Sequence, residues 1–175
     1  LRRNQRQRIQ CMRENGFTPV PVILIVDDQP NDVLLLQEAV ADLGDIHIAH
    51  DGETALALAN AHRPDLILLD IQMPGMNGFQ LCKAIKATPR ICDAAIVFVT
   101  AHTQTDYEIL ALEYGGIDFI QKPLSLPVVH AHARAHLALR AEANRLAYYD
   151  DLTALPNRAL LRDRAEQTLQ SARET

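Results

Sequence analysis

The sequence has no tryptophan, few aromatic residues (5%), three cysteines and no excess of positive charge. Its formal net charge is −5, so the chain has no overall basic field that would attract nucleic acid or anionic lipid. Cys11, Cys82 and Cys92 are widely spaced and odd in number, which argues against a disulfide framework or a zinc site of paired cysteines. No apolar run approaches the roughly 18 residues of a membrane span. These absences favour a cytoplasmic chain that binds neither nucleic acid nor membrane.

Length and composition predict one complete domain with a smaller appendage. The chain has 175 residues, of which 48% are apolar, enough for a single core of ordinary size. Residues 1–20 contain several arginines but lack the apolar stretch of a signal peptide, so we expect them to form an N-terminal extension. Because the sequence begins with Leu1 rather than Met, we also expect a fragment or a processed form of a longer protein.

Strand and helix patterns alternate from residue 22 onward. The apolar runs 22–26 and 66–69 are short, which is typical of strands buried on both faces. A segment of helical spacing follows the first run and ends at Gly44. Five such units predict an α/β fold with a doubly wound, five-stranded parallel sheet. The predicted strands are 22–26, 46–49, 66–69, 95–100 and 118–121, and the predicted helices are 31–43, 53–61, 79–87, 106–114 and 126–149.

The last predicted helix is unusually long. It holds seven alanines between residues 131 and 147, and no Gly or Pro interrupts it after Pro127. We expect an extended C-terminal helix that acts as a connector or packs against another chain; the alternative is a helix that trails into solvent. A seam for a homodimer through the fourth and fifth helices would use Val128, His132, Ala135, Leu139, Glu142, Leu146 and Tyr149.

Three acids stand at predicted strand ends. Asp27 and Asp28 follow the first strand, and Asp70 follows the third. The carboxyl ends of parallel strands meet at one edge of a sheet, where open α/β folds bind ligands. Two like charges 4 Å apart repel by about 4 kcal/mol at an effective dielectric of 20, so the cluster needs a raised pKa or a cation. Oxygen ligands favour Mg²⁺, although each acid alone could be a loop residue or a helix cap.

Two further polar residues close later strands. Thr100 supplies a hydroxyl and Lys122 a positive charge. With a cation, they could neutralise phosphoryl oxygens while a carboxylate attacks phosphorus. Taken alone, Thr100 is equally well explained by its β propensity, and Lys122 by solvent exposure.

These residues resemble the receiver domain of two-component response regulators. The resemblance covers residues 21–139 and implies a flavodoxin-like sheet in the order 2-1-3-4-5. It implies that a sensor histidine kinase or a phosphotransfer protein donates the phosphoryl group. The matching motifs, in order, are Asp27-Asp28, Asp70 with the following Met73-Pro74-Gly75-Met76-Asn77-Gly78, Thr100-Ala101 and Lys122-Pro123.

The resemblance also implies roles for the acidic residues. Asp70 would accept the phosphoryl group. Asp28 and Asp70 would bind Mg²⁺ directly, the main-chain carbonyl of Gln72 would be a third ligand, and Asp27 would act largely through water. Gln72 and His102 match positions that flank the attacking water and would set the lifetime of the phosphate.

The remaining matches concern the phosphoryl group and the response to it. Thr100 and Lys122 would contact phosphoryl oxygens, and the Lys122-Pro123 bond is often cis in the family. Phe119 matches an aromatic residue that changes position on phosphorylation, although a Phe in a strand is equally well explained as core.

Residues 149–158 carry a second resemblance, to the opening of a GGDEF-type diguanylate cyclase domain, with Ala154 where glycine is usual. We therefore expect a helical linker over 140–151 and the truncated start of a GGDEF-like domain over 152–175. The implied output is a GGDEF or GGDEF-EAL module; the alternative is a degenerate GGDEF domain that serves protein interaction. Because no glycine follows Gly116, we expect residues 1–175 neither to make nor to degrade cyclic di-GMP.

Rival functions fit the residues less well. A phosphatase with an aspartate nucleophile would have a second acid two positions after Asp70, where Gln72 stands. A flavin carrier would need a hydroxyl- and glycine-rich loop in place of the two acids after the first strand. His132 and His136 are spaced to bind a metal, but with His130 they are expected to form a solvent-facing row.

Overall fold

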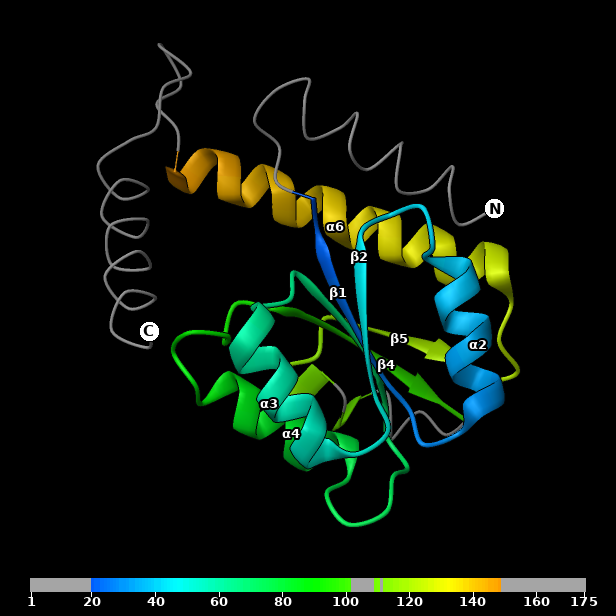
Figure 1. The fold of residues 1–175 in the computed structure, drawn as a ribbon. Coiled ribbons are helices and arrows are strands. Elements are labelled where there is room, and N and C mark those ends of the chain that lie inside the picture. Colours follow the sequence, from blue (N-terminus) through cyan, green and yellow to red (C-terminus); the bar gives the residue numbers. More distant parts are fainter. Residues whose placement is uncertain (1–19, 102–108, 111, 149–175) are drawn as a thin grey trace, which may run out of the picture. The chain divides into compact units, whose positions relative to one another are not determined.

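The computed structural model describes residues 20–101, 109–110 and 112–148 (Figure 1). Residues 106–108 and 111 of the predicted helix 106–114 lie outside these ranges, as do residue 102 and residues 1–19 and 149–175. The elements are β1 (Val22–Val26), α2 (Pro30–Ala39), β2 (Asp45–Ala49), α3 (Gly52–His62), β3 (Leu66–Asp70), α4 (Gly78–Lys86), β4 (Ala95–Thr100), β5 (Asp118–Gln121) and α6 (Leu126–Tyr148).

The five strands form one parallel sheet in the order β2-β1-β3-β4-β5, which confirms the predicted topology. In the register, Val26 of β1 pairs with Leu69 of β3, and Asp70 pairs with Val99 of β4. The carboxyl ends of β1, β3 and β4 therefore lie next to one another, and the chain order brings distant acids to the same edge of the sheet.

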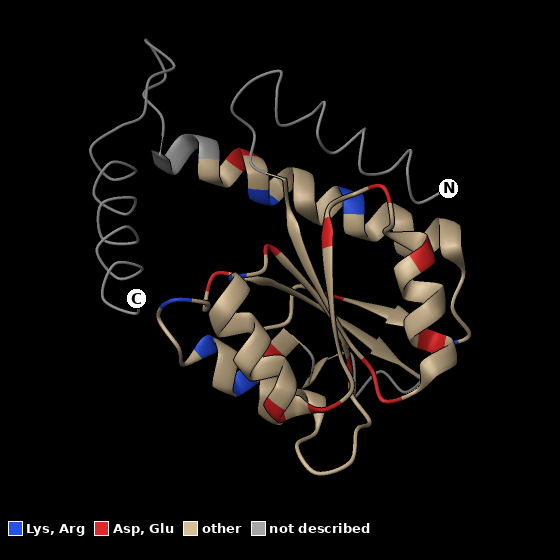
Figure 2. Cartoon of the chain, in the orientation of Figure 1, with Lys and Arg blue, Asp and Glu red and all other residues tan. Residues whose placement is uncertain are grey.

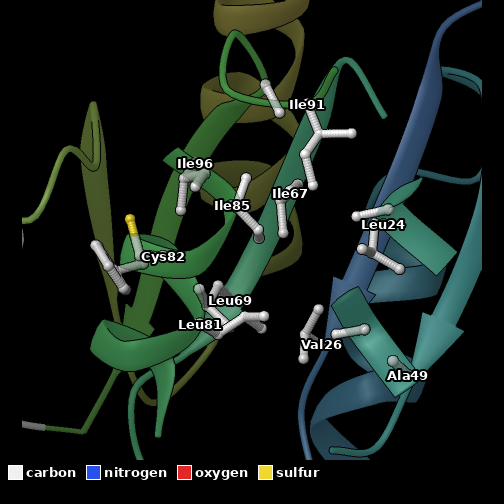
Figure 3. Close-up of a cluster of buried hydrophobic side chains, with 14 of the residues drawn as sticks. Leu24, Val26, Ala49, Ile67, Leu69, Leu81, Cys82, Ile85, Ile91 and Ile96 are labelled. Atoms are coloured by element: carbon white, nitrogen blue, oxygen red, sulfur yellow. The ribbon is translucent and has the colours of Figure 1, made fainter. Parts of the chain in front are cut away.

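Each face of the sheet has its own core. On β3, Ile67 and Leu69 contribute to a cluster that also contains residues of α3 and α4 (Figure 3), whereas Leu66 and Leu68 contribute to a cluster with residues of α2 and α6. All four of these side chains are fully buried. Because a central parallel strand buries both faces, its sequence is a continuous apolar run, and this is why the strands were predicted closely.

Local hydrogen bonds fix where helices on one face begin. Asp51 accepts a hydrogen bond from the backbone N–H of Thr54 at 2.8 Å and so caps α3. Asn77 and Gln80 form a capping box at the start of α4. Such caps satisfy backbone N–H groups that have no partner within the helix.

The prediction of where the first helix ends is wrong. It was expected to reach residue 43, but α2 stops at Ala39, and Val40 leaves the helical conformation with φ −112° and ψ 11°. The chain must turn here because Asp45 donates a backbone hydrogen bond to the Pro21 carbonyl at 2.8 Å as β2 begins beside β1. A Cβ on Gly44 would collide with that same carbonyl, so a glycine is required at the turn.

The extended C-terminal helix is confirmed, since α6 runs unbroken for 23 residues. Val129, Ala133 and Leu137 are its buried apolar residues in the core that it shares with α2. The chain divides into two compact units, Leu1–Leu137 and Ala138–Thr175, so the boundary falls within this helix. Over the described residues, every helix is too short or too polar to cross a bilayer.

Candidate functional site

Acidic residues gather where the strands end. Asp27 follows β1 and is fully buried, Asp28 comes next, and Asp70 is the buried last residue of β3. Figure 2 shows acidic residues in the loop after β1 and at the start of α2. The three acids lie close together, as the sequence predicts, because one carboxylate oxygen from each lies within 4.8 Å of the others.

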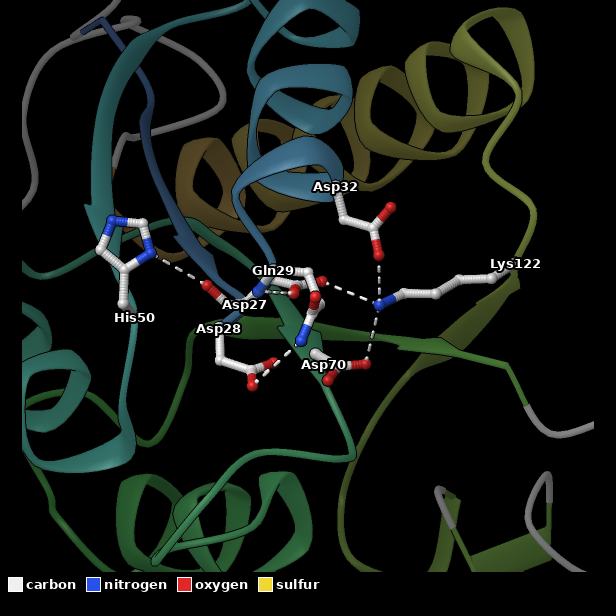
Figure 4. A network of polar contacts seen from close by, with 7 residues as sticks. All are labelled: Asp27, Asp28, Gln29, Asp32, His50, Asp70 and Lys122. Atoms are coloured by element: carbon white, nitrogen blue, oxygen red, sulfur yellow. Dashed lines mark hydrogen bonds and ion pairs between the residues drawn. The ribbon is translucent and has the colours of Figure 1, made fainter.

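Lys122 reaches into this cluster from the segment after β5 (Figure 4). Its Nζ lies 3.0 Å from Asp27 Oδ2, 3.2 Å from Asp70 Oδ1 and 2.7 Å from Asp32 Oδ2. The lysine side chain is only 16% exposed, which rules out the alternative of a solvent-exposed lysine. One ammonium group thus faces three carboxylates, and Asp28 adds a fourth negative group to the site.

Burial and the excess of negative charge shift the pKa values of the groups in the site. Burial raises the pKa of Asp70 to about 6, an effect that Lys122 opposes only in part and that the charge of Asp27 increases. Burial also raises the pKa of Asp27, although hydrogen bonds from the Gln29 backbone and Lys122 act in the opposite direction. Burial alone would lower the pKa of Lys122, but its contacts with the carboxylates outweigh burial and raise it. The site therefore favours added positive charge.

The carboxylate oxygens are not all satisfied. Asp27 Oδ1 accepts a hydrogen bond from the Gln29 backbone N–H at 2.8 Å, and Asp28 Oδ2 accepts one from the Gln29 side chain at 3.3 Å. By contrast, Asp28 Oδ1 is buried and has no hydrogen-bond partner among the described residues. A buried carboxylate oxygen without a donor is costly unless a cation binds it. This oxygen and its neighbours fit a hard divalent ion with oxygen ligands.

Thr100 and Gln72 lie along the same edge, whereas Phe119 lies near the start of β5. Thr100 is the buried last residue of β4, one position beyond the residue that pairs with Asp70. Gln72 is exposed in the loop after β3. Phe119 is partly buried against the core cluster that contains residues of α3 and α4. The peptide bond between Lys122 and Pro123 is cis, as the family resemblance implied.

Two contacts at the site were missed from the sequence. Asp32, in the first turn of α2, contacts Lys122, and the ring nitrogen Nδ1 of His50 lies 3.1 Å from the carbonyl oxygen of Asp27. An acid in the first turn of a helix is usually explained by its favourable interaction with the helix dipole. For this reason the sequence did not indicate that Asp32 contacts Lys122. Its position four residues after Asp28, on the helix that leaves the site loop, was the available signal.

A glycine holds α4 close to Asp70. A Cβ added to Gly78 would collide with the backbone carbonyl of Asp70 and lie 2.9 Å from the Cα of Ile71. The backbone N–H of Gly78 also donates to the Ile71 carbonyl at 3.0 Å. The turn after β3 thus returns tightly to the strand end and fixes the backbone that carries Asp70.

Comparison with known families decides what this arrangement is. The family described as the response regulator receiver domain matches residues 23–134. The chain belongs to the response regulator receiver family. Receivers take phosphoryl groups from histidine kinases or phosphotransfer proteins, and they generally bind Mg²⁺ at an acidic pocket. In this receiver, Asp27, Asp28 and Asp70 form a cluster of acidic residues.

Individual relatives give the same family. The receiver is 32% identical to a protein of Vibrio cholerae named as a probable cyclic di-GMP phosphodiesterase, over 74% of this chain and 29% of that protein. It is 40% identical to the response regulator PleD of Caulobacter vibrioides, over 65% of this chain and 25% of PleD. The solved chemotaxis response regulator CheY4 of Vibrio cholerae aligns with a TM-score of 0.63 and 25% identity, covering 67% of this chain and 99% of CheY4. The receiver thus spans about a quarter of the length of the first two relatives.

Proposed function

We propose that this receiver accepts a phosphoryl group on Asp70 from a sensor histidine kinase or a phosphotransfer protein. The observation that carries the proposal is the position of Asp70, buried at the end of β3, 3.2 Å from Lys122 and grouped with Asp27 and Asp28. In this proposal the receiver covers residues 21–139, preceded by an extension over 1–20.

The chain's own groups perform the transfer. An ionised Oδ of Asp70 forms the bond to phosphorus while the bond from phosphorus to the donor's imidazole nitrogen breaks and leaves its electron pair on that nitrogen. Lys122 and the Thr100 hydroxyl bind phosphoryl oxygens as negative charge redistributes. Mg²⁺, held by Asp28, Asp70 and the Gln72 carbonyl with Asp27 acting through water, would supply positive charge at the phosphoryl oxygens.

The test is phosphorylation of the 175-residue chain with Mg²⁺ and a small phosphodonor such as acetyl phosphate. Intact-mass measurement should show a single labile phosphate on the native chain and none on Asp70→Asn. Asp93→Asn is the matched control, because Asp93 is an exposed acid before β4 and should label normally. Unchanged labelling of Asp70→Asn would refute the assignment.

The output in this proposal is a cyclic di-GMP module of GGDEF or GGDEF-EAL type. Two observations support it: residues 149–158 resemble the start of a GGDEF domain, and one relative is named as a probable cyclic di-GMP phosphodiesterase. Residues 140–151 then serve as a helical linker and 152–175 as the first part of that module. The alternative is a degenerate GGDEF domain whose output is protein interaction.

The two outputs differ in catalytic activity. Extending the chain with its native downstream sequence should give a protein that makes cyclic di-GMP from GTP or hydrolyses it, at a rate that changes when beryllofluoride occupies the receiver. If the extended protein has neither activity in either state, the interaction alternative replaces the catalytic one.

A further inference from the structure

Asp118, His132 and His136 form a second polar cluster, which phosphoryl transfer does not use. Asp118 is the first residue of β5, whereas the phosphorylation site lies at the carboxyl ends of the strands. Asp118 Oδ2 lies 2.6 Å from His132 Nδ1 and 2.7 Å from His136 Nε2. Residues four apart on a helix share a face, which is why both imidazoles reach the same carboxylate.

The expected solvent-facing histidine row is therefore wrong for His136, and His132 also contacts Asp118 although part of its side chain is exposed. The side chain of His136 is 15% exposed and that of His132 is 35% exposed. His130 differs from both, because its Nε2 lies 3.4 Å from Asp42 Oδ1 and takes no part in the cluster. The sequence could not reveal the pairing, because it depends on α6 lying against the start of β5.

The carboxylate of Asp118 is held in a fixed orientation. Its Oδ1 accepts a hydrogen bond from the backbone N–H of Phe119 at 2.8 Å, which leaves Oδ2 directed at the histidines. Burial alone would raise the pKa of Asp118, but hydrogen bonds from the two histidines and the Phe119 backbone outweigh burial and lower it. Asp118 is thus an ionised carboxylate with one oxygen bound by the Phe119 backbone and the other shared by the two histidines.

We propose that Asp118, His132 and His136 bind a divalent transition-metal ion such as Zn²⁺. Their donor atoms lie within 4.8 Å of one another. Around a tetrahedral Zn²⁺ with bonds of roughly 2.0–2.2 Å, neighbouring ligand atoms are about 3.3 Å apart, so each hydrogen-bonded pair needs to separate by less than about 1 Å. Each imidazole binds through the nitrogen that now faces Asp118 and carries its proton on the other ring nitrogen.

The donor set also indicates which ions fit. Two imidazoles and one carboxylate are typical of zinc and other transition metals, whereas Mg²⁺ prefers oxygen ligands alone. Three protein ligands leave a fourth position for water. The side chains are partly exposed, which gives an ion a path of entry. The two sites therefore differ in metal preference, and excess Mg²⁺ can occupy the acidic pocket without filling this one.

Calorimetric titration of the 175-residue chain with Zn²⁺, in excess Mg²⁺, tests the proposal. We expect one tightly bound equivalent, and a loss of affinity of at least tenfold in His136→Ala and in Asp118→Asn. His130→Ala is the matched control, since it removes a histidine of the same helix outside the cluster, and it should bind as the native chain does. His47 and His62 stack with ring centroids 3.8 Å apart, so His62→Ala is a second control for adventitious binding.

Nuclear magnetic resonance of the native chain keeps the test independent of how the variants fold. Addition of one equivalent of Zn²⁺ should shift the imidazole signals of His132 and His136 and leave those of His130 unchanged. The proposal is overturned if the native chain binds no Zn²⁺, if His136→Ala binds it equally well, or if His62→Ala is the variant that loses binding. In each of these cases the cluster is a hydrogen-bonded contact between β5 and α6 alone.

Discussion

Asp70 carries its negative charge at a cost to stability. Its pKa is raised from 3.8 to about 6 in the folded chain. Because the folded chain binds this proton more tightly than the unfolded chain does, protonation of Asp70 stabilises the fold. This stabilisation is complete below about pH 3.8 and is lost as the pH rises through about 6. At neutral pH, the acid that we propose as the phosphoryl acceptor therefore destabilises the receiver.

Replacing that acid with a neutral isostere should stabilise the metal-free chain. We expect Asp70→Asn to raise the free energy of unfolding at pH 7.5, in EDTA, by up to about 3 kcal/mol, the equivalent of the pKa difference. The gain should shrink as the pH falls from 6 and vanish near 4. Urea unfolding across this range measures it. A gain that is constant with pH, or no gain at pH 7.5, would contradict the raised pKa.

Lys122 has the opposite effect, because it neutralises carboxylates that are buried around it. Lys122→Met leaves Asp27 fully buried without its ammonium partner. We expect a loss of about 2 to 4 kcal/mol in the free energy of unfolding at pH 7.5, which Mg²⁺ should partly restore. Lys83→Met, at an exposed position on α4, is the control and should change stability little. Equal stability of the two variants would show that the ion pairs contribute nothing.

At the scale of the elements, the turn from β3 to α4 is tightly constrained by the close approach of Gly78 to the end of β3. Gly78→Ala places a methyl group against the backbone of Asp70 and Ile71. We expect it to lower the free energy of unfolding by about 1 to 3 kcal/mol, as overpacking does, and to slow phosphorylation because Asp70 is displaced. Urea unfolding and the rate of labelling by acetyl phosphate measure the two effects.

The control for this turn is Gly75→Asn. Gly75 has φ +75°, which asparagine tolerates, and a Cβ there would meet no atom within 4 Å. This variant should label at the native rate. If Gly75→Asn and Gly78→Ala slow labelling equally, loop flexibility rather than the position of Asp70 is responsible.

The features of this receiver that the sequence predicts are those set by local patterns, and the features that it does not predict depend on contacts between distant segments of the chain. The strands were predicted closely because burial on both faces forces apolar runs, and the strand-end acids followed from the topology. The early end of α2 was missed because it depends on the backbone of Pro21, which is far from it along the chain. The Asp32 contact and the histidine pair at Asp118 were missed for a similar reason, since each joins two elements whose packing no local pattern specifies.

At the scale of the whole molecule, we expect two chains to associate through α6 when the receiver is phosphorylated. Val128 and Leu139 are 46% and 67% exposed and belong to the predicted dimer seam. His132, a third seam residue, contacts Asp118 of its own chain, so the seam is polar at that position. Leu146 and Tyr149 lie where side chains are not described. A dimer formed by this helix alone should therefore be weak and easily shifted.

Sedimentation tests this association. We expect the chain to be mainly monomeric and to shift toward a dimer when beryllofluoride and Mg²⁺ occupy the phosphorylation site. Leu139→Glu should prevent the shift while leaving acetyl phosphate labelling unchanged. A monomer under both conditions at tens of micromolar would rule out a dimer switch for this chain.

The unbroken course of α6 through the boundary between the two compact units has a geometric consequence. Each residue of an α-helix turns the chain by about 100° and advances it by about 1.5 Å. If the helix stays intact, the direction in which it presents the following residues is set by the number of residues between Leu137 and Tyr148. One inserted residue would rotate everything downstream by more than a quarter of a turn, whereas seven would restore the original direction to within about 20°. In such a connector, the count of residues matters as much as their identity.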